Sequence, residues 1–430
     1  MTLGSSSGRS FIFQASQILQ ETPLNDRPRY YPALLVGLLC LNFGILFFDR
    51  NSLNFLMPFV QPDLGFSNTE VGMIASAFSL TWAIAGIAVG GLSDRLGMRK
   101  PILIAVTLVF AACSALSGIV SSFIMLFAVR LLMGIAEGGV LPISQALTVI
   151  EVAPARRGFA MGFMQNFGSN LLGSTAASMI LVPFATHFGW RKAFFLAAVP
   201  AAVSALLVAW LVHEPPREAT VAGAPKEHLS LVGALAHKNI VLCILMSVLL
   251  VSHLVIGFVF LPLFLVNVRG LAPETMGNLI GALGVSAAIS GFVAPGISDW
   301  VGRRPTLIVV TFAGVILPAA ALYYHGSVWS LGAIFFAGWV VVGAFPLFMA
   351  TIPSETVDSR HTATALGLIM GVGEGVGGAL SPTLAGMAAD RYGLNAPLWI
   401  MFCLPILAGL LALGIKETAP RRIAARAGVV

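Results

Sequence analysis

Four ionisable side chains lie within apolar stretches of this 430-residue chain. Asp49 and Arg50 interrupt the run LNFGILFFDRNSLN, and Arg130 and Glu137 occur in RLLMGIAEGGVLP. An arginine can bind a carboxylate through two parallel hydrogen bonds. A buried carboxylate can exchange a proton for a salt bridge with arginine. These residue types suit the binding of an organic anion together with the movement of protons.

Arg130 and Glu137 are seven residues apart, which on an α-helix is almost two turns and a rise of about 10 Å. They would therefore share one face without contacting each other. That leaves Arg130 free to bind an anion and Glu137 free to interact with a cation. The alternative is a static buried network in which Asp49 and Glu137 only neutralise the arginines.

Asp49 and Arg50 are adjacent, so on a helix their side chains would point about 100° apart. Asn42 lies seven residues before Asp49, and Asn54 lies four residues after Arg50, so each amide extends one polar face. A charged side chain at the middle of a membrane costs at least about 2.5–3.5 kcal/mol and therefore usually faces a cavity or a partner. We expect these residues to line an internal site.

Polar residues in three other apolar stretches are further candidates. His253 lies in SVLLVSHLVIGF, and Glu374 lies in GVGEGVGG, where glycines would allow close helix approach. Either could line the site, His253 as a substrate contact and Glu374 as a proton or substrate site. Either could instead make a structural hydrogen bond. Amide side chains in the fifth apolar stretch, at least one of which should line the cavity, are Gln165, Asn166 and Asn170.

The composition requires a membrane environment. The chain is 57% apolar and 10% charged, against roughly 25% charged in soluble domains. The apolar residues form stretches of about twenty, the length of a helix that crosses a bilayer. The four cysteines lie in such stretches without metal-ligand spacing, so we read them as buried apolar residues. We expect no metal and no other cofactor.

The apolar stretches predict an all-α membrane protein with twelve transmembrane helices in two six-helix halves. The division is a disordered tail (1–30), an N-terminal bundle (31–212), a linker (213–237), a C-terminal bundle (238–416) and a C-terminal tail (417–430). The predicted spans are approximately 31–58, 67–92, 101–120, 122–150, 157–182, 189–212, 238–268, 273–298, 304–325, 328–352, 361–388 and 393–416.

The basic residues indicate the orientation of these spans, because Lys and Arg resist translocation. With both termini in the cytoplasm, the opposite loops hold only Arg191, Lys192, Arg269 and Arg391. The remaining basic residues are scattered between spans and form no continuous face, so the net charge of +6 does not indicate nucleic-acid binding. Attraction to anionic lipid is sufficient to explain them.

A repeated motif indicates that the two halves are copies. The chain reads GLSDRLGMR after the second span and GISDWVGRR after the eighth, an offset of 205 residues. Duplicated halves with a substrate site between them are a transporter architecture. The residues of this motif, including the glycine before its first copy, are Gly90, Asp94, Arg95, Gly97, Arg99, Asp299, Arg303 and Arg304.

The loop GGLSDRLGMRK resembles the signature loop of the major facilitator superfamily, with Met98 in place of a more usual basic residue. The resemblance implies that this loop latches the cytoplasmic side. DRNSLN and RLLMGIAEGGVLP resemble the first and fourth spans of the anion:cation symporter family. That resemblance implies that Arg50 and Arg130 hold the substrate, while Asp49 and Glu137 carry protons.

The aromatic residues near these motifs bear on the kind of substrate. The family usually has a substrate-contacting tyrosine where this chain has Trp82, so a hydroxyl is lost and apolar area is gained. Together with Phe47 and Phe48, Trp82 would make the site more aromatic than a sugar acid requires. An aromatic or compact apolar carboxylate is therefore an alternative to a sugar acid.

These observations predict a proton-coupled importer of an organic monoanion in the bacterial inner membrane, active as a monomer, and not an enzyme. No G-x-x-x-x-G-K-[ST] motif for ATP is present, so an ion gradient is the expected energy source. The alternatives are a uniporter and a proton-driven efflux transporter of small organic compounds. A membrane sensor would need a soluble output domain, which this sequence does not contain.

Overall fold

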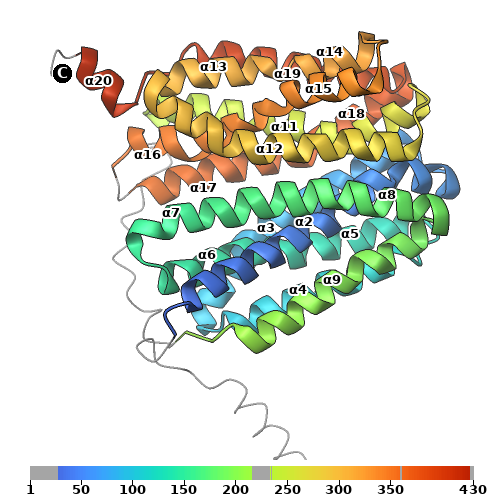
Figure 1. Cartoon of the computed structure of the whole chain (residues 1–430), viewed down its shortest axis with the longest axis horizontal. Helices are drawn as coiled ribbons and strands as arrows, with labels where there is room; N and C mark the ends of the chain where they lie inside the picture. Colours follow the sequence, from blue (N-terminus) through green and yellow to red (C-terminus); the bar gives the residue numbers. More distant parts are fainter. Residues whose placement is uncertain (1–27, 216–232, 234, 359–360, 427–430) are drawn as a thin grey trace, which may run out of the picture.

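The computed structural model describes residues 28–215, 233, 235–358 and 361–426, and every regular element in these residues is helical. Figure 1 shows the helices running side by side along one common direction. The predicted tail 1–30, linker 213–237 and tail 417–430 lie partly or mostly outside the described residues. Their boundaries stay predictions. The elements are α2 (Tyr31–Leu64), α3 (Asn68–Leu96), α4 (Lys100–Ser117), α5 (Phe123–Gly138), α6 (Val140–Glu151), α7 (Pro154–Gly162), η2 (Phe163–Ala176), α8 (Ala177–Phe188), α9 (Trp190–Leu211), α11 (Lys238–Asn267), α12 (Pro273–Val301), α13 (Arg303–Ala313), α14 (Ile316–Tyr323), α15 (Val328–Trp339), η4 (Val340–Ala344), η5 (Leu347–Thr351), α16 (Ile352–Thr356), α17 (Thr362–Val372), η6 (Gly373–Gly378), α18 (Ala379–Tyr392), α19 (Asn395–Ala412) and α20 (Pro420–Arg426).

Within the described residues, twelve helical stretches are long and apolar enough to cross a membrane, which confirms the predicted fold class. The first helix is longer than predicted, because it continues through Pro58 and Pro62 to Leu64. Prolines are tolerated in membrane helices because neighbouring groups satisfy the freed backbone. Gly65, with a φ of 69°, then ends the helix, and Ser67 begins α3 with a capping box.

Three spans contain π-helical turns, namely η2 in the fifth, η5 in the tenth and η6 in the eleventh. Such turns are rare and occur frequently at functional sites. η2 contains the three amide residues singled out above, and η6 contains Glu374. The predicted site residues of these two spans therefore lie in irregular helix.

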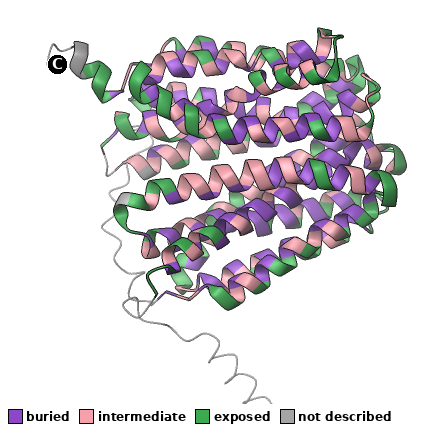
Figure 2. Cartoon of the chain, viewed as in Figure 1, coloured by how far each residue is buried: buried purple, intermediate pink, exposed green. Residues whose placement is uncertain are grey.

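The outer surface of the bundle is apolar, as lipid contact requires. Figure 2 shows buried residues concentrated inside the bundle and exposed residues at its ends and on its outer faces. Ile87 is 79% exposed, and the tryptophans Trp210, Trp300 and Trp329 near helix ends are 83%, 72% and 91% exposed. Tryptophans are enriched at both interfaces of a bilayer. Their positions therefore agree with a protein whose helices span the membrane.

The two halves end in the same cap. We call the membrane side where α2 begins and α19 ends the terminal side, and the other the far side (Figure 1). On the terminal side, Glu214 accepts the backbone N–H groups of Arg99 and Lys100 at 2.6 Å each. Glu417 does the same for Arg303 and Arg304, at 2.8 and 3.2 Å. A carboxylate at a helix N-terminus is favourable, although burial raises the pKa of the Glu214 carboxyl. This shared cap supports the duplication.

The two motif copies lie on the terminal side and differ in their ion pairs. Arg303 pairs with Asp299 at 2.5 Å and with Glu355 at 2.9 Å. The equivalent position in the first copy is Met98, and Asp94 pairs only with Arg99, at 3.5 Å, among the described residues. The side chain of Asp94 is 64% exposed. Of the other motif residues, Gly97 has a φ of 61°, and Gly90 packs against Pro142. Arg95 is exposed, and Arg304 donates a hydrogen bond to the Leu413 carbonyl at 2.7 Å. The latch function of this motif stays a prediction.

On the far side the two halves are joined by a carboxylate at a helix start. Asp390 of α18 accepts four hydrogen bonds from the first turn of α3. The backbone and side-chain groups of Asn68 donate at 2.9 Å each, and those of Thr69 donate at 2.8 and 2.5 Å. One step further in, Thr383 donates to Ser76 through its hydroxyl at 2.8 Å. The far side is therefore held closed in this structure.

Asp390→Ala should open the far side more often, because it removes four bonds between the halves and leaves the start of α3 without this carboxylate. The readout is labelling of a cysteine introduced at Ser79, which is 2% exposed, by a membrane-impermeant thiol reagent applied only from the far side. We expect labelling several-fold faster than with Asp390 present. The matched control is Glu70→Gln, because Glu70 caps the same helix but its carboxylate bonds, within the described residues, only to Ser67. Equal rates in both variants would contradict a latch at Asp390.

Candidate functional site

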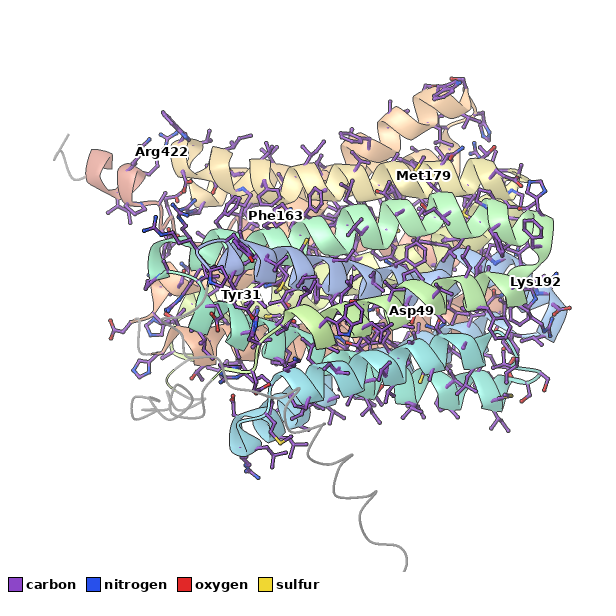
Figure 3. The ribbon with its side chains drawn as sticks, turned by 60° about the horizontal axis from the view of Figure 1, so that its bottom comes forward. Tyr31, Asp49, Phe163, Met179, Lys192 and Arg422 are labelled. Carbon is purple, nitrogen blue, oxygen red and sulfur yellow. The ribbon has the colours of Figure 1, made fainter. Side chains whose placement is uncertain are left out.

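Asp49, Arg130 and Glu137 lie inside the N-terminal half. Asp49 belongs to α2 and the other two belong to α5, and their exposed fractions are 0%, 2% and 0%. Figure 3 shows Asp49 in the interior of the bundle, between its two ends. Asp49, Arg50 and Arg130 all lie within electrostatic range of Glu137. We call Asp49, Arg50, Arg130 and Glu137 the four-charge cluster.

The acids of this cluster have unsatisfied oxygen atoms. Among the described residues, none of the four carboxylate oxygens of Asp49 and Glu137 accepts a hydrogen bond. The guanidinium of Arg130 contacts the Met133 sulfur at 3.2 Å and the Phe194 ring at 5.8 Å, and its Nε and Nη2 have no partner in the described chain. Buried polar groups are normally hydrogen-bonded. These orphaned atoms therefore suit groups that take up and release protons or exchange partners.

Arg50 lies at the edge of the cluster and is held by aromatic rings. Its guanidinium carbon is 4.7 Å from the centre of the Phe78 ring and 5.4 Å from the centres of the Phe47 and Trp82 rings. Such cation–π contacts stabilise a cation in a desolvated place. Arg50 is half-buried and makes no hydrogen bond or ion pair with another described residue. Its fork of N–H donors is therefore available to an anion.

Close packing of α5 on α3 fixes the part of α3 that carries two of these rings, Phe78 and Trp82. A methyl group on Gly134 would lie 2.6 Å from the Phe78 carbonyl oxygen, and one on Gly138 would lie 2.5 Å from the Trp82 carbonyl oxygen. Only glycine permits this approach of two helix backbones. The family-like glycines around Glu137 thus position the aromatic residues of α3 next to Arg50.

Glu374 approaches the same place from the C-terminal half. It lies in η6, is half-buried, and its Oε2 has no hydrogen-bond partner in the described chain. It is within electrostatic range of Arg50. The sequence left two alternatives for Glu374, a helix–helix hydrogen bond and a position in the site. Its side chain makes no such hydrogen bond to another described residue.

The remaining predicted residues occupy different surroundings. Asn54 and Gln165 are half-buried, and no hydrogen bond of either side chain to another described residue is found. Asn166 donates to the Ala288 carbonyl at 3.0 Å and so joins the two halves, and Asn170 donates to Asn166 at 2.7 Å. Asn42 is buried and donates to Thr107 at 3.4 Å.

His253 is enclosed within the C-terminal half. It is 1% exposed, its Nδ1 lies 2.8 Å from the Met401 carbonyl oxygen, and its ring centre lies 5.9 Å from that of Trp339. The Nε2 of His253 and the Nε1 of Trp339 are both without a partner in the described residues. The histidine therefore makes the structural hydrogen bond that was one alternative, and one of its nitrogens is still unused.

Two polar neighbours of the cluster were missed by the sequence reasoning. Asn51 is buried and donates to the Gly173 carbonyl at 3.4 Å and to Ser174 at 3.3 Å, which fixes α2 against η2. Ser114 of α4 lies beside Asp49. Asn51 directly follows the charged pair and could have been noticed. Ser114 sits in an ordinary apolar stretch, so its sequence position gives no signal.

A protein-family model described as Major Facilitator Superfamily matches residues 39–374 of this chain. The chain belongs to the major facilitator superfamily. This confirms the superfamily resemblance of the signature loop and the twelve-span architecture. The protein is thus a transporter and not an enzyme.

Several relatives that align with most of the length of this superfamily member are named as transporters of organic anions. A probable sulfoacetate transporter of Cupriavidus necator is 24% identical and covers 84% of this chain and 88% of its own. A hexuronate transporter of Bacillus subtilis is 26% identical, covering 81% and 86%. A gallate transporter of Pseudomonas putida is 28% identical, covering 91% and 93%. These names are consistent with the resemblance to the anion:cation symporters.

Solved structures agree on the fold. A bacterial homologue of the human lysosomal transporter Spinster, in an inward-facing and occupied conformation, aligns with a TM-score of 0.73 at 17% identity, covering 90% of this chain and 97% of that one. A nucleoside transporter aligns with a TM-score of 0.73 at 15% identity, covering 88% and 98%. At these identities the likeness concerns the fold alone.

Proposed function

We propose that this major facilitator protein imports an organic monocarboxylate together with protons by alternating access. The observation that carries the proposal is Arg50, a cation held by three aromatic rings within the membrane and without an acid partner in the described chain. A carboxylate can accept two parallel hydrogen bonds from such a guanidinium. The terminal side is assigned to the cytoplasm of a bacterial inner-membrane protein that works as a monomer.

Arg50 and Arg130 have different parts in this proposal. Arg50 is the half-buried one and binds the substrate carboxylate. Arg130 is 2% exposed and lies within electrostatic range of both Asp49 and Glu137, so its charge stabilises whichever of these acids is ionised. Trp82 forms a wall of the site. Further predicted substrate contacts are Asn54, Gln165 and Asn166. His253 is predicted to make a contact through Nε2, the ring nitrogen that its hydrogen bond to the Met401 carbonyl leaves unused in the described chain.

The charges of the site favour proton coupling. The four-charge cluster contains two acids and two arginines, so it is neutral when all four groups are ionised. An anion that binds Arg50 adds one negative charge in a region where unbalanced charge is costly. Protonation of Asp49 and Glu137 as the substrate binds compensates for this charge and for that of Glu374. The names of the sulfoacetate, hexuronate and gallate relatives support a small organic anion.

The first test is uptake into proteoliposomes, with substrates chosen by a thermal-shift screen of sugar acids, dicarboxylates and aromatic acids. We expect an inward pH gradient to drive accumulation of the hit, and a protonophore to abolish it. Equilibration that is indifferent to the gradient would identify a uniporter. Accumulation that occurs only with the proton gradient reversed, with the more acidic side inside the vesicle, would identify a proton-driven efflux transporter and would exclude import.

A further inference from the structure

Glu374 is the titratable group near Arg50 that the proposed transport cycle does not use as a proton carrier. It reaches the site from the C-terminal half, whereas Arg50 and its three aromatic rings all belong to the N-terminal half. The π-helical turn η6 carries it in the sequence GEGVGG. The substrate would therefore lie between one cation on one half and one acid on the other.

The surroundings of Gly378 locate the carboxylate of Glu374. A methyl group on Gly378 would lie 2.8 Å from Oε2 of Glu374 and 3.4 and 3.5 Å from Cβ and Oγ of Ser79. On α3, Ser79 precedes Trp82 by three residues and Phe78 precedes it by four, so each of the two side chains is a neighbour of Trp82 on the helix surface. The carboxylate thus lies beside the α3 face whose aromatic rings hold Arg50.

The acid and the arginine are near each other without pairing. Arg50 is within electrostatic range of Glu374, yet no ion pair of 4.0 Å or less joins them in the described chain. Oε2 of Glu374 has no hydrogen-bond partner there. A desolvated acceptor of this kind lacks one donor, which a bound molecule could supply.

We propose that Glu374 selects the substrate: it accepts a hydrogen bond from a hydroxyl or N–H group of an aromatic carboxylate whose carboxylate binds Arg50. This inference rests on the proposed function and adds the chemical class of the substrate. An ionised Glu374 repels a second anionic or purely accepting group, so only a donor makes its presence favourable. A site built to hydrogen-bond a donor rejects analogues that lack it.

The aromatic part of the inference follows from the walls of the site. Phe47, Phe78 and Trp82 surround the guanidinium of Arg50, and a flat ring can stack or make edge contacts with such residues. A polyhydroxylated sugar acid would place hydroxyl groups against these rings, where they would lose hydrogen bonds to water without replacement. A substrate hydroxyl near Glu374 can donate its hydrogen bond to this acid, whereas several hydroxyls that point elsewhere would find no acceptor on the rings.

The charges also balance for such a substrate. With Asp49 and Glu137 protonated, the two arginines carry two positive charges, and the substrate and an ionised Glu374 carry two negative ones. The loaded site is then neutral. Glu374 therefore accepts the donor as a carboxylate, while the two acids of the four-charge cluster carry the protons.

The test compares ligands that differ only in the donor, on the full-length protein in detergent. Competition binding uses benzoate, 3- and 4-hydroxybenzoate, the corresponding methoxybenzoates and glucuronate. A hydrogen bond to a charged group contributes about 1.5–3 kcal/mol, so one hydroxy isomer should bind roughly 10- to 100-fold more tightly than its methoxy counterpart. Glu374→Gln should reduce that ratio to a small factor. Glu374→Asp keeps a carboxylate acceptor, so this variant should still bind the hydroxy ligand more tightly than the methoxy ligand.

The control is Asp358→Asn, which changes an exposed acid outside the site and should leave the ratio unchanged. Equal binding of hydroxy and methoxy ligands by the unmodified protein, or an unchanged ratio in Glu374→Gln, would overturn the role of Glu374. Preference for glucuronate would overturn the aromatic class while carboxylate transport stands. Binding of no carboxylate at all, with intact thermal unfolding, would remove the proposed function as well.

Discussion

Replacing Arg50 by lysine should abolish concentrative uptake although the positive charge is kept. Lysine presents a point charge and cannot form the two parallel hydrogen bonds of a guanidinium, nor stack as arginine does on the rings of Phe47, Phe78 and Trp82. The loss of one charge-assisted hydrogen bond is about 1.5–3 kcal/mol, so we expect the dissociation constant to rise roughly 10- to 100-fold. Isothermal titration calorimetry measures the dissociation constant, and uptake into vesicles measures concentrative transport.

The control for this variant is Arg191→Lys. Arg191 pairs with Asp63 at 2.6 Å on the far side and is 45% exposed, so its conservative change should alter neither binding nor uptake. Near-normal transport by Arg50→Lys would eliminate Arg50 as the carboxylate-binding group. Arg130→Lys should also abolish accumulation. Because Arg130 is enclosed, we expect its effect on substrate affinity to be the smaller one.

Replacing Glu137 by glutamine should separate transport from proton coupling. The amide imitates the protonated acid permanently, so exchange of labelled for unlabelled substrate should continue while accumulation on a pH gradient is lost. The structural basis is that both oxygens of Glu137 are buried and lack a hydrogen-bond partner in the described chain. Asp49→Asn should behave similarly or also weaken binding. Accumulation that survives in Glu137→Gln would exclude this residue from the proton path.

The same proteoliposomes test the stoichiometry. If Asp49 and Glu137 each carry a proton with one monoanion, each cycle moves one net positive charge inward. A membrane potential then contributes about 2.3 kcal/mol per 100 mV to uptake, which is roughly a fifty-fold concentration ratio. With potassium-clamped potentials, uptake by the unmodified protein should rise with inside-negative voltage. Uptake that ignores voltage would exclude two protons per monoanion.

The sequences of α2 and α5 were sufficient to single out four charged residues of the candidate site. An ionisable group in an apolar stretch is costly, so Asp49, Arg50, Arg130 and Glu137 stand out against their neighbours. The seven-residue spacing of Arg130 and Glu137 correctly predicted that these two side chains do not pair directly in the described chain. The first helix was predicted to end near residue 58, and it extends to Leu64, because a proline in a membrane helix does not have to end it.

The sequence by itself determined the membrane class, the twelve spans and the duplicated halves, because hydrophobic length and repeated motifs are local properties of the chain. Only the tertiary structure decided that Arg50 is half-buried among rings of α2 and α3 while Arg130 is enclosed, and that Asp390 joins the halves. The same holds for Glu374, whose surroundings come from α2 and α3. These facts depend on which helix faces pack together. Helix packing is set by close contacts between residues that lie tens to hundreds of positions apart, which no single stretch of sequence records.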